Sequence, residues 1–260
     1  MSTSPGFEVH AFNCKIRVET PSPELHEILN RYIFPSLPRV NCGSTTPDIS
    51  LRVVADTDQF DLLVDEAKVA SAADPMSLAL GSIKALDEAV IRNLAKLRAV
   101  HAGAVLVGNK ALLLPGSTHA GKSSLVAELL RRGATYLSDE YALVDSLGHV
   151  HPYPRPLLLR NGRPEQFPVL PGELNSRFAR AAAPVGWVLS LKYKPDGAWS
   201  VGQVAQSEGV MMLLKNTPHA LEESPELVSL FLRAVEGARC YSGIRGDALN
   251  AAEQILQLAG

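Results

Sequence analysis

Residues 116 to 123 read Gly-Ser-Thr-His-Ala-Gly-Lys-Ser and match the pattern G-x-x-x-x-G-K-[ST]. Glycines in such a run let the backbone curl, so that successive N–H groups point at phosphate oxygens. Lys122 supplies a cation for the terminal phosphates, and the Ser123 hydroxyl is a suitable ligand for Mg²⁺. An apolar run precedes the motif and an amphipathic run follows it, which predicts a strand, a loop and a helix whose positive end faces the phosphates. The sequence therefore predicts a phosphate-binding loop.

Two familiar classes of phosphate-loop protein have no support in this sequence. A GTPase carries an N-K-x-D motif that reads guanine, and an ATP-binding-cassette engine carries LSGGQ; neither motif is present. Phosphoryl transfer to an acceptor remains, and this chemistry needs a base that takes the proton of the acceptor.

The best candidate for that base is Asp139. It ends the strand that is predicted to follow the helix of the loop, and in a doubly wound sheet this position lies beside the phosphates. Glu140, the next residue, can serve the metal, provided that Mg²⁺ and Lys122 offset the charge of two adjacent carboxylates. The alternative is an aspartate that only holds Mg²⁺ through water, because both roles use the same position.

Hydrophobic patterning predicts the elements that must position these residues. Apolar runs at 104–107 and 110–114, joined by a Gly-Asn pair, predict a hairpin that feeds the loop. A helix is expected over 122–132, and a buried strand over 134–138. Further hairpins are predicted over 141–153 and 186–205, helices over 210–214, 225–236 and 247–258, and a strand over 238–244.

The part before the loop reads as a separate small unit. Strands are predicted over 12–19 and 48–55, a helix with a serine cap over 22–34, and one long helix from Asp74 to Arg98. The whole pattern predicts the α/β class: a mixed sheet with flanking helices over residues 99–260, and a small N-terminal α+β lobe over residues 1–98.

The stretch HAGAVLVGNKALLLPGSTHAGKSSLVAELLRRGATYLSDEYALVD, residues 101–145, resembles the catalytic core of HPr kinase/phosphorylase. In that family a histidine opens a hairpin, the phosphate loop follows, a helix ends in Arg-Gly, and a strand delivers two adjacent acids. The chain is similar in particular to HPr-kinase-related proteins of biosynthetic clusters, which read LSDE at the acids and continue much as HPYPRPLLLR does here. The resemblance covers residues 101–160 and implies the P-loop fold of the HPr kinase and phosphoenolpyruvate carboxykinase type.

The resemblance implies roles for the matching residues. Asp139 is implied as the base that activates a hydroxyl acceptor, and Glu140, in place of the family's second aspartate, as a metal ligand. His101 matches the family histidine near the phosphates; a hydrogen-bonded structural histidine is the alternative. Ser123 is implied to meet Mg²⁺. The residues implied to cradle ATP are Gly116, Ser117, Thr118, His119, Ala120, Gly121, Lys122, Ser123 and Ser124.

One departure from the family changes the expected acceptor. The later Leu-Glu-x-Arg-Gly-Leu-Gly-like signature, linked to phosphorylase action and HPr docking, is absent, and RPLLLRNGRPEQFPVLPG stands there instead. We therefore expect a kinase for another hydroxyl, such as Ser or Thr of a peptide or protein, or a small amino-acid-like molecule. Arg155 in this stretch is a candidate contact for the phosphate or an acidic acceptor, because guanidinium matches phosphate geometry. A regulatory module that binds nucleotide without transfer, and a transferase that uses pyrophosphate or another donor, stay open.

Composition and net charge narrow the classes of molecule expected as binding partners. A net charge of −2 and a pI near 6.4 give no reason to expect nucleic acid. Three scattered cysteines form no disulfide or zinc pattern. The first residues lack the pattern of a signal peptide, and no apolar stretch approaches the ~20 residues of a membrane span. The expectation is a cytoplasmic protein with no membrane partner; a homo-oligomer is compatible with the sequence.

Overall fold

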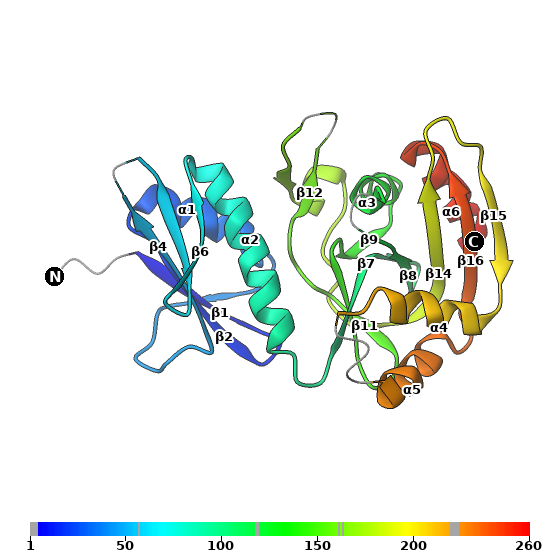
Figure 1. Cartoon of the computed structure of the whole chain (residues 1–260), viewed down its shortest axis with the longest axis horizontal. Helices are drawn as coiled ribbons and strands as arrows, with labels where there is room; N and C mark the ends of the chain where they lie inside the picture. The colour runs from blue at the N-terminus through cyan, green and yellow to red at the C-terminus, as the bar shows by residue number, and fades with distance from the viewer. Residues whose placement is uncertain (1–4, 57, 118–119, 161, 163, 219–223) are drawn as a thin grey trace. The chain divides into compact units, whose positions relative to one another are not determined.

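The computed structural model describes residues 5–56, 58–117, 120–160, 162, 164–218 and 224–260 (Figure 1). Contacts between Cα atoms divide the chain into two compact units. Unit 1 comprises Met1–Ala95, Pro154–Pro156 and Arg160–Pro168, and unit 2 comprises Lys96–Tyr153, Leu157–Leu159 and Val169–Gly260. This division differs from a single boundary at residues 98 and 99, because two short segments after Tyr153 belong with unit 1.

Unit 1 is a mixed sheet with two helices. In the described part of the unit, the order of the six strands is β3-β1-β2-β4-β5-β6. The strands are β1 (Gly6–Ala11), β2 (Cys14–Glu19), β3 (Arg39–Val40), β4 (Ile49–Ala55), β5 (Phe60–Val64) and β6 (Ala67–Ala72), and the helices are α1 (Pro23–Tyr32) and α2 (Pro75–Arg92). The strand predicted at 12–19 begins two residues later, because Phe12 and Asn13 have positive φ and form the turn between β1 and β2. The predicted cap of α1 is confirmed, since the Ser22 side chain accepts from the Leu25 N–H.

The long helix predicted from Asp74 to Arg98 is shorter in the structure. Its start is confirmed, with Asp74 as the N-cap and Pro75 as the first helical residue, but the helix ends at Arg92. The side chain of Asn93 donates to the carbonyl of Ala89 at 2.8 Å and so satisfies one of the last helix carbonyls. The apolar residues that suggested a longer helix fall in the connection to the next strand.

Removing the Asp74 cap is expected to destabilise the protein. Asp74 Oδ1 accepts from the N–H groups of Met76 and Ser77, at 2.9 and 3.0 Å, and Oδ2 accepts from the Ser77 hydroxyl at 2.6 Å. We expect Asp74→Ala to lower the free energy of unfolding by about 1 kcal/mol at neutral pH, whereas Asp58→Ala, in an exposed loop, should change it little.

The loss should also depend on pH. The Ser77 hydroxyl, followed by the backbone N–H groups, holds the pKa of the Asp74 carboxyl below its usual range. The unfolded chain therefore takes up the proton first as the pH falls, so the contribution of the cap is present above the unfolded pKa and is lost as the pH falls through the folded one. Urea unfolding at neutral and acidic pH tests this; an equal difference between wild type and Asp74→Ala at both pH values would contradict it.

Unit 2 contains the predicted phosphate loop. In its described part the larger sheet has eight strands, in the order β11-β10-β7-β8-β14-β16-β15, with β9 beside β7 and an additional pairing of β11 with β14. Its strands are β7 (Arg98–Val107), β8 (Lys110–Pro115), β9 (Thr135–Ser138), β10 (Tyr141–Val144), β11 (His149–His151), β14 (Ala183–Tyr193), β15 (Ser200–Val204) and β16 (Arg239–Arg245). Its helices are α3 (Lys122–Arg131), α4 (Gln206–Lys215), α5 (Ser224–Val235) and α6 (Ala248–Ala259). The short strand β12 (Leu157–Leu159) also belongs to unit 2; β13 (Phe167–Val169) begins in unit 1 and ends in unit 2, and the short helix η1 (Pro171–Leu174) follows it. The predicted mixed α/β class is confirmed.

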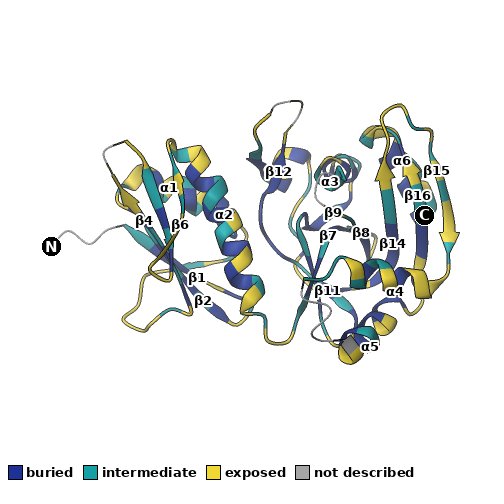
Figure 2. Cartoon of the chain, in the orientation of Figure 1, coloured by how far each residue is buried: buried dark blue, intermediate teal, exposed yellow. Residues whose placement is uncertain are grey.

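The hairpin predicted over 186–205 is wrong. Strands β14 and β15 do not pair with each other; β16 lies between them, parallel to β14 and antiparallel to β15. The reason is burial: the middle of β14 is buried and pairs in parallel with β8 on its other side, whereas β15 is largely exposed. Figure 2 shows the same contrast between the dark strands β8 and β14 and the yellow strand β15.

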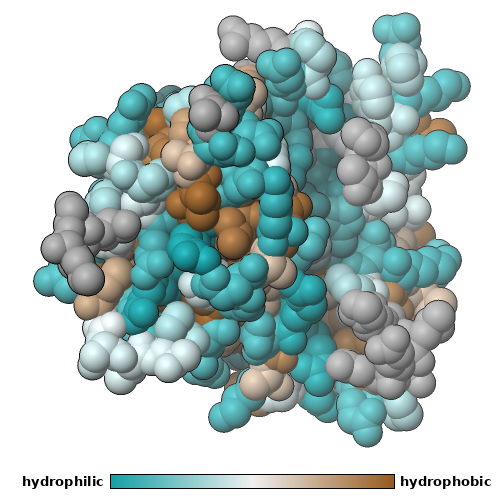
Figure 3. All heavy atoms as spheres, turned by 60° about the vertical axis from the view of Figure 1, so that its left-hand side comes forward, coloured by the Kyte–Doolittle hydropathy of each residue, from teal (hydrophilic) through white to brown (hydrophobic). Residues whose placement is uncertain are grey.

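Apolar side chains are scattered among polar ones on the described surface. Large apolar side chains reach solvent at scattered positions, among them Val40, Val54, Val69 and Met76 of unit 1. The face drawn in Figure 3 is mainly hydrophilic, with smaller hydrophobic areas between the polar residues. Single exposed apolar side chains are normal on a protein in water. None of the helices in the described ranges is long and apolar enough to cross a membrane.

The order of three strands brings the predicted site together. Strand β7 is antiparallel to both β8 and β9, with Ala102 opposite Pro115 and Ala104 opposite Ser138. The C-terminal ends of β8 and β9 therefore lie at the same end of the sheet as the N-terminal start of β7. Helix α3 packs on β7 at Gly103, where a Cβ atom would lie 2.6 Å from the Val126 side chain.

Candidate functional site

The predicted loop connects β8 to α3. Gly121 has a φ of 74°, a left-handed conformation that favours glycine. Helix α3 begins at Lys122, so Ser123 and Ser124 lie in its first turn. Thr118 and His119, two of the residues predicted to cradle ATP, lie outside the described residues. The described residues have the strand, loop and helix arrangement that the motif predicts, with backbone N–H groups at the helix start.

The Lys122 ammonium is partly buried and already engaged by the loop. Its Nζ donates to the carbonyls of Gly116, at 2.8 Å, and Ser117, at 3.0 Å. Burial lowers the pKa of Lys122, while the negative charges of Glu140 and Asp139 act in the opposite direction. A cation removed from water in this way gains from an anion placed beside it, which fits the terminal phosphates of a nucleotide.

Arg245, at the end of β16, contacts the loop from outside, although no motif in the sequence points to it. Its side chain is 3% exposed. Nη2 donates to the carbonyls of Ala120, at 3.1 Å, and Gly121, at 2.9 Å, and Nη1 donates to the carbonyl of Gly246 at 2.8 Å. The guanidinium carbon lies 5.2 Å from the centre of the Tyr193 ring. A Cβ at Gly121 would meet Arg245 Nη2, so a larger residue there would have to displace the guanidinium from the loop, besides adopting the positive φ.

The contacts of Arg245 determine the direction of the loop's N–H groups. In a trans peptide the carbonyl and the following N–H point in opposite directions. Because the carbonyls of Ala120 and Gly121 face Arg245, the N–H groups of Gly121 and Lys122 point away from it. Arg245 thus fixes two peptide groups in the orientation that a phosphate cradle needs.

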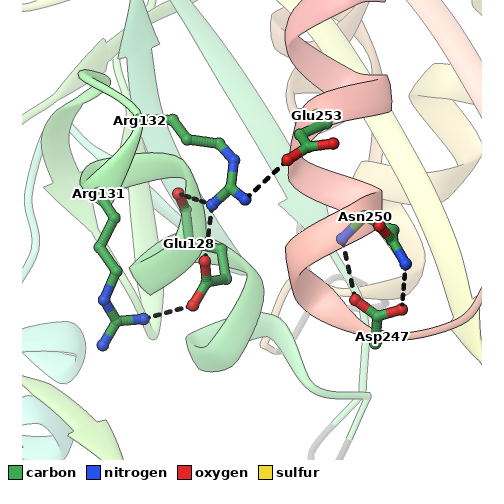
Figure 4. A network of polar contacts seen from close by, with 6 residues as sticks. All are labelled: Glu128, Arg131, Arg132, Asp247, Asn250 and Glu253. Carbon is green, nitrogen blue, oxygen red and sulfur yellow. Dashed lines mark hydrogen bonds and ion pairs between the residues drawn. The ribbon is translucent and has the colours of Figure 1, made fainter.

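The far end of α3 is fixed by a second set of ionic contacts (Figure 4). Arg132, just after the helix, contacts Glu128 at 2.7 Å and Glu253 of α6 at 3.1 Å. Asp247, the N-cap of α6, accepts from the Asn250 N–H at 2.9 Å. Helix α6 follows Arg245 directly, so one segment of chain, from β16 into α6, holds both ends of the loop helix.

The two predicted acids occupy different environments. Asp139 is 1% exposed. Glu140 lies at the surface, with its side chain 36% exposed, and its Oε1 lies 2.9 Å from Nε2 of His101, on β7. The same His101 nitrogen lies 3.4 Å from Lys122 Nζ. The structure therefore brings the predicted histidine, lysine and glutamate into one contact chain, with the aspartate beneath the surface.

A cavity of about 480 Å³ opens beside this contact chain. His101 lines it from β7, Tyr141 from β10, Glu140 from the bend before β10, and Ser117 from the loop. The end of α4 contributes the rest of the lining, Lys215–Pro218. The backbone N–H of His101 donates to the carbonyl of Asn216 at 2.6 Å, which ties the end of α4 to β7. The volume lies within the range of about 300–1,000 Å³ typical of small-molecule sites.

Arg155, a predicted phosphate or acceptor contact, has a partner within its own unit. It belongs to unit 1, is 3% exposed, and its Nη2 lies 3.1 Å from Asp87 Oδ2 of α2. This contact gives Arg155 a buried ionic partner within unit 1, and its role as a phosphate contact stays a prediction. No motif points to Arg245 or to the end of α4, because these residues reach the site only through the fold.

Comparisons with known proteins add little. No family model matches the chain, and no curated protein matches it. Among solved structures, the chain is similar to the Hpr(Ser) kinase/phosphatase from Coxiella burnetii, with 14% sequence identity and a TM-score of 0.33 over 62% of this chain and 93% of that chain. A likeness of this degree carries no argument about function.

Proposed function

We propose that this protein is an ATP-dependent kinase that transfers the γ-phosphoryl group to a hydroxyl of a peptide, protein or small molecule. The observation that carries the proposal is the contact chain from Lys122 through His101 to Glu140, beside an open cavity. A phosphate loop alone would serve any nucleotide-binding protein. Acidic groups and a cavity next to its lysine are what a transfer reaction needs in addition. The sequence resemblance to HPr kinase supports the same class.

The proposed reaction needs little covalent chemistry from the protein. The acceptor oxygen forms a bond to the γ-phosphorus, the bond from that phosphorus to the β,γ-bridging oxygen breaks, ADP leaves, and the acceptor's proton passes to a carboxylate. Lys122 offsets negative charge on the phosphates. Mg²⁺, held by Ser123 and one acid, would supply further positive charge at the phosphate oxygens. The donor is proposed as ATP because of the family resemblance, since the loop itself binds only phosphates.

The exposures of the two acids favour an exchange of the roles implied by the resemblance. A base must lie within hydrogen-bonding reach of the acceptor hydroxyl. Glu140 lines the cavity and contacts His101, whereas Asp139 is 1% exposed. We therefore assign the base to Glu140 and the metal-holding role to Asp139, near Lys122 and the loop.

The direct test is transfer of labelled γ-phosphate from ATP to Ser- and Thr-containing peptides and to free hydroxy and amino acids. We expect labelled acceptor with Mg²⁺ and none after Mg²⁺ is chelated. Lys122→Met serves as the matched inactive variant. Binding of ATP with no transfer to any acceptor of the panel would contradict the proposal and favour a regulatory nucleotide-binding module.

Arg245 should control nucleotide affinity without touching the nucleotide. Arg245→Met removes a donor from the carbonyls of Ala120 and Gly121. Gly121 keeps the N–H of Leu125, at 3.2 Å, so the loss falls mainly on Ala120, and a carbonyl that stays shielded from water without a donor costs about 1–3 kcal/mol. We expect the Kd for ATP to rise about tenfold or more, and Arg245→Lys to recover part of the loss. Arg239→Met, at an exposed position of the same strand, is the control. Isothermal calorimetry measures these values; an unchanged Kd for a folded Arg245→Met variant would refute the positioning role.

A further inference from the structure

The end of α4 forms one wall of the cavity, and this wall has no part in the proposed phosphate transfer. It contributes four consecutive residues, Lys215–Pro218, to a cavity whose other lining residues belong to the proposed phosphate and acid site. The bond from the His101 N–H to the Asn216 carbonyl, at 2.6 Å, fixes this wall to the strand that carries the histidine. A molecule in the cavity would therefore meet both the proposed base and the end of α4.

Two polar side chains of this wall are occupied by the helix itself. Asn216 Nδ2 donates to the carbonyl of Met212, and Thr217 Oγ1 donates to the carbonyl of Leu213, each at 2.8 Å. The Asn216 amide gives the Met212 carbonyl a donor at the helix end, and Thr217 adds a second bond to the Leu213 carbonyl, which also accepts from the Asn216 N–H at 3.1 Å. The Asn216 amide nitrogen and the Thr217 hydroxyl are thus engaged by the helix end.

Lys215 is the remaining polar side chain of this wall. It is exposed and lines the cavity, and in the part of the chain that is described no hydrogen bond or ion pair engages its ammonium group. A lysine is a compact cation with three donors on a flexible stem. It recognises an anionic group, and a carboxylate is the anion that stands close to the hydroxyl in hydroxy acids and in serine.

We propose that Lys215 binds a carboxylate of the acceptor, so that the substrates of the proposed kinase are small hydroxyl compounds that carry a carboxylate near the hydroxyl. This inference rests on the proposed function. The carboxylate sits against Lys215 while the hydroxyl faces Glu140 and His101. Free L-serine has this chemistry, and so does the C-terminal serine of a peptide; a serine inside a peptide does not, unless an acidic residue lies beside it.

The test compares acceptors that differ only in the carboxylate. Transfer is measured with L-serine, serinamide, a peptide ending in serine, and the same peptide with an amidated end. For the carboxylates we expect Lys215→Ala to raise KM about 10- to 100-fold with little change in kcat, and Lys215→Arg to stay near wild type. For the amides the variants should equal wild type. L-serine and the serine-ending peptide separate the two sources of the carboxylate.

The controls distinguish the possible failures. Lys194→Ala, at an exposed position outside the cavity lining, should leave every KM unchanged. A lysine that only offsets the dipole of the helix end would shift the melting temperature slightly, but it would not separate acids from amides. Equal KM values of Lys215→Ala and wild type for L-serine would overturn the inference while the kinase stands. If wild type transferred no phosphate but bound L-serine, and Lys215→Ala abolished that binding, the proposed kinase activity would be overturned. The proposed carboxylate site at Lys215 would stand.

Discussion

Glu140→Gln is expected to slow phosphoryl transfer about 10²- to 10⁴-fold at saturating Mg²⁺, while the affinity for ATP stays close to wild type. This is the range by which a positioned base accelerates proton transfer. Glutamine keeps the size of the side chain and an acceptor atom for the contact with His101, which in the wild type spans 2.9 Å, so the loss reports the missing carboxylate. Single-turnover transfer of labelled phosphate measures the rate.

Asp139→Asn serves as the matched variant. A buried carboxylate that holds the metal should, when neutralised, raise the Mg²⁺ concentration needed for half-maximal transfer, and part of the rate should return at high Mg²⁺. In the opposite pattern, Asp139→Asn would lose rate at every Mg²⁺ concentration and Glu140→Gln would need more Mg²⁺. That result would show that Asp139 is the base, as the family resemblance implies.

The buried ion pair of unit 1 should produce the largest effect on stability. Arg155 and Asp87 lie 3.1 Å apart, with side chains 3% and 7% exposed. Removal of one partner leaves a charge in a buried environment, and such changes cost about 3–5 kcal/mol. We expect Asp87→Leu to lower the melting temperature markedly and to increase hydrogen exchange of the α2 amides.

The double variant Asp87→Leu/Arg155→Met separates two quantities: the net contribution of the ion pair to the free energy of unfolding, and the cost of one uncompensated buried charge. Replacement of both ions by apolar side chains of similar size is often neutral or stabilising. The double variant should therefore be more stable than either single variant, which gives a large coupling energy. Single variants within about 1 kcal/mol of wild type would show that water reaches the pair.

Local signals in the sequence were sufficient for most of the elements. The Gly-Asn turn between β7 and β8, the serine cap of α1 and the glycine after α3 each act within a few residues. The loop motif is equally local, because backbone curvature, a lysine and a hydroxyl lie within eight residues.

Long-range pairing explains what the sequence did not predict. The short segment KPDG between β14 and β15 favours a hairpin, but β16, which lies some 40 residues further along, pairs with both strands. The same separation hides Arg245 and Lys215 from motif reasoning. The burial of Asp139 against the exposure of Glu140 is also tertiary, since the two residues are adjacent in the sequence and differ only in what covers them.

The contact of Arg245 with the loop has a consequence for the order of events during synthesis. The two residues of the bond to Gly121 are 124 positions apart, so a ribosome that adds about 5–20 residues per second makes the arginine roughly 6–25 s after the glycine. Throughout that interval the nascent chain holds the loop, its lysine and both acids, but not the side chain that orients the loop's peptide groups. The proposed nucleotide site is therefore complete only after β16 has docked, so any stabilisation of the fold by ATP would begin only at that point.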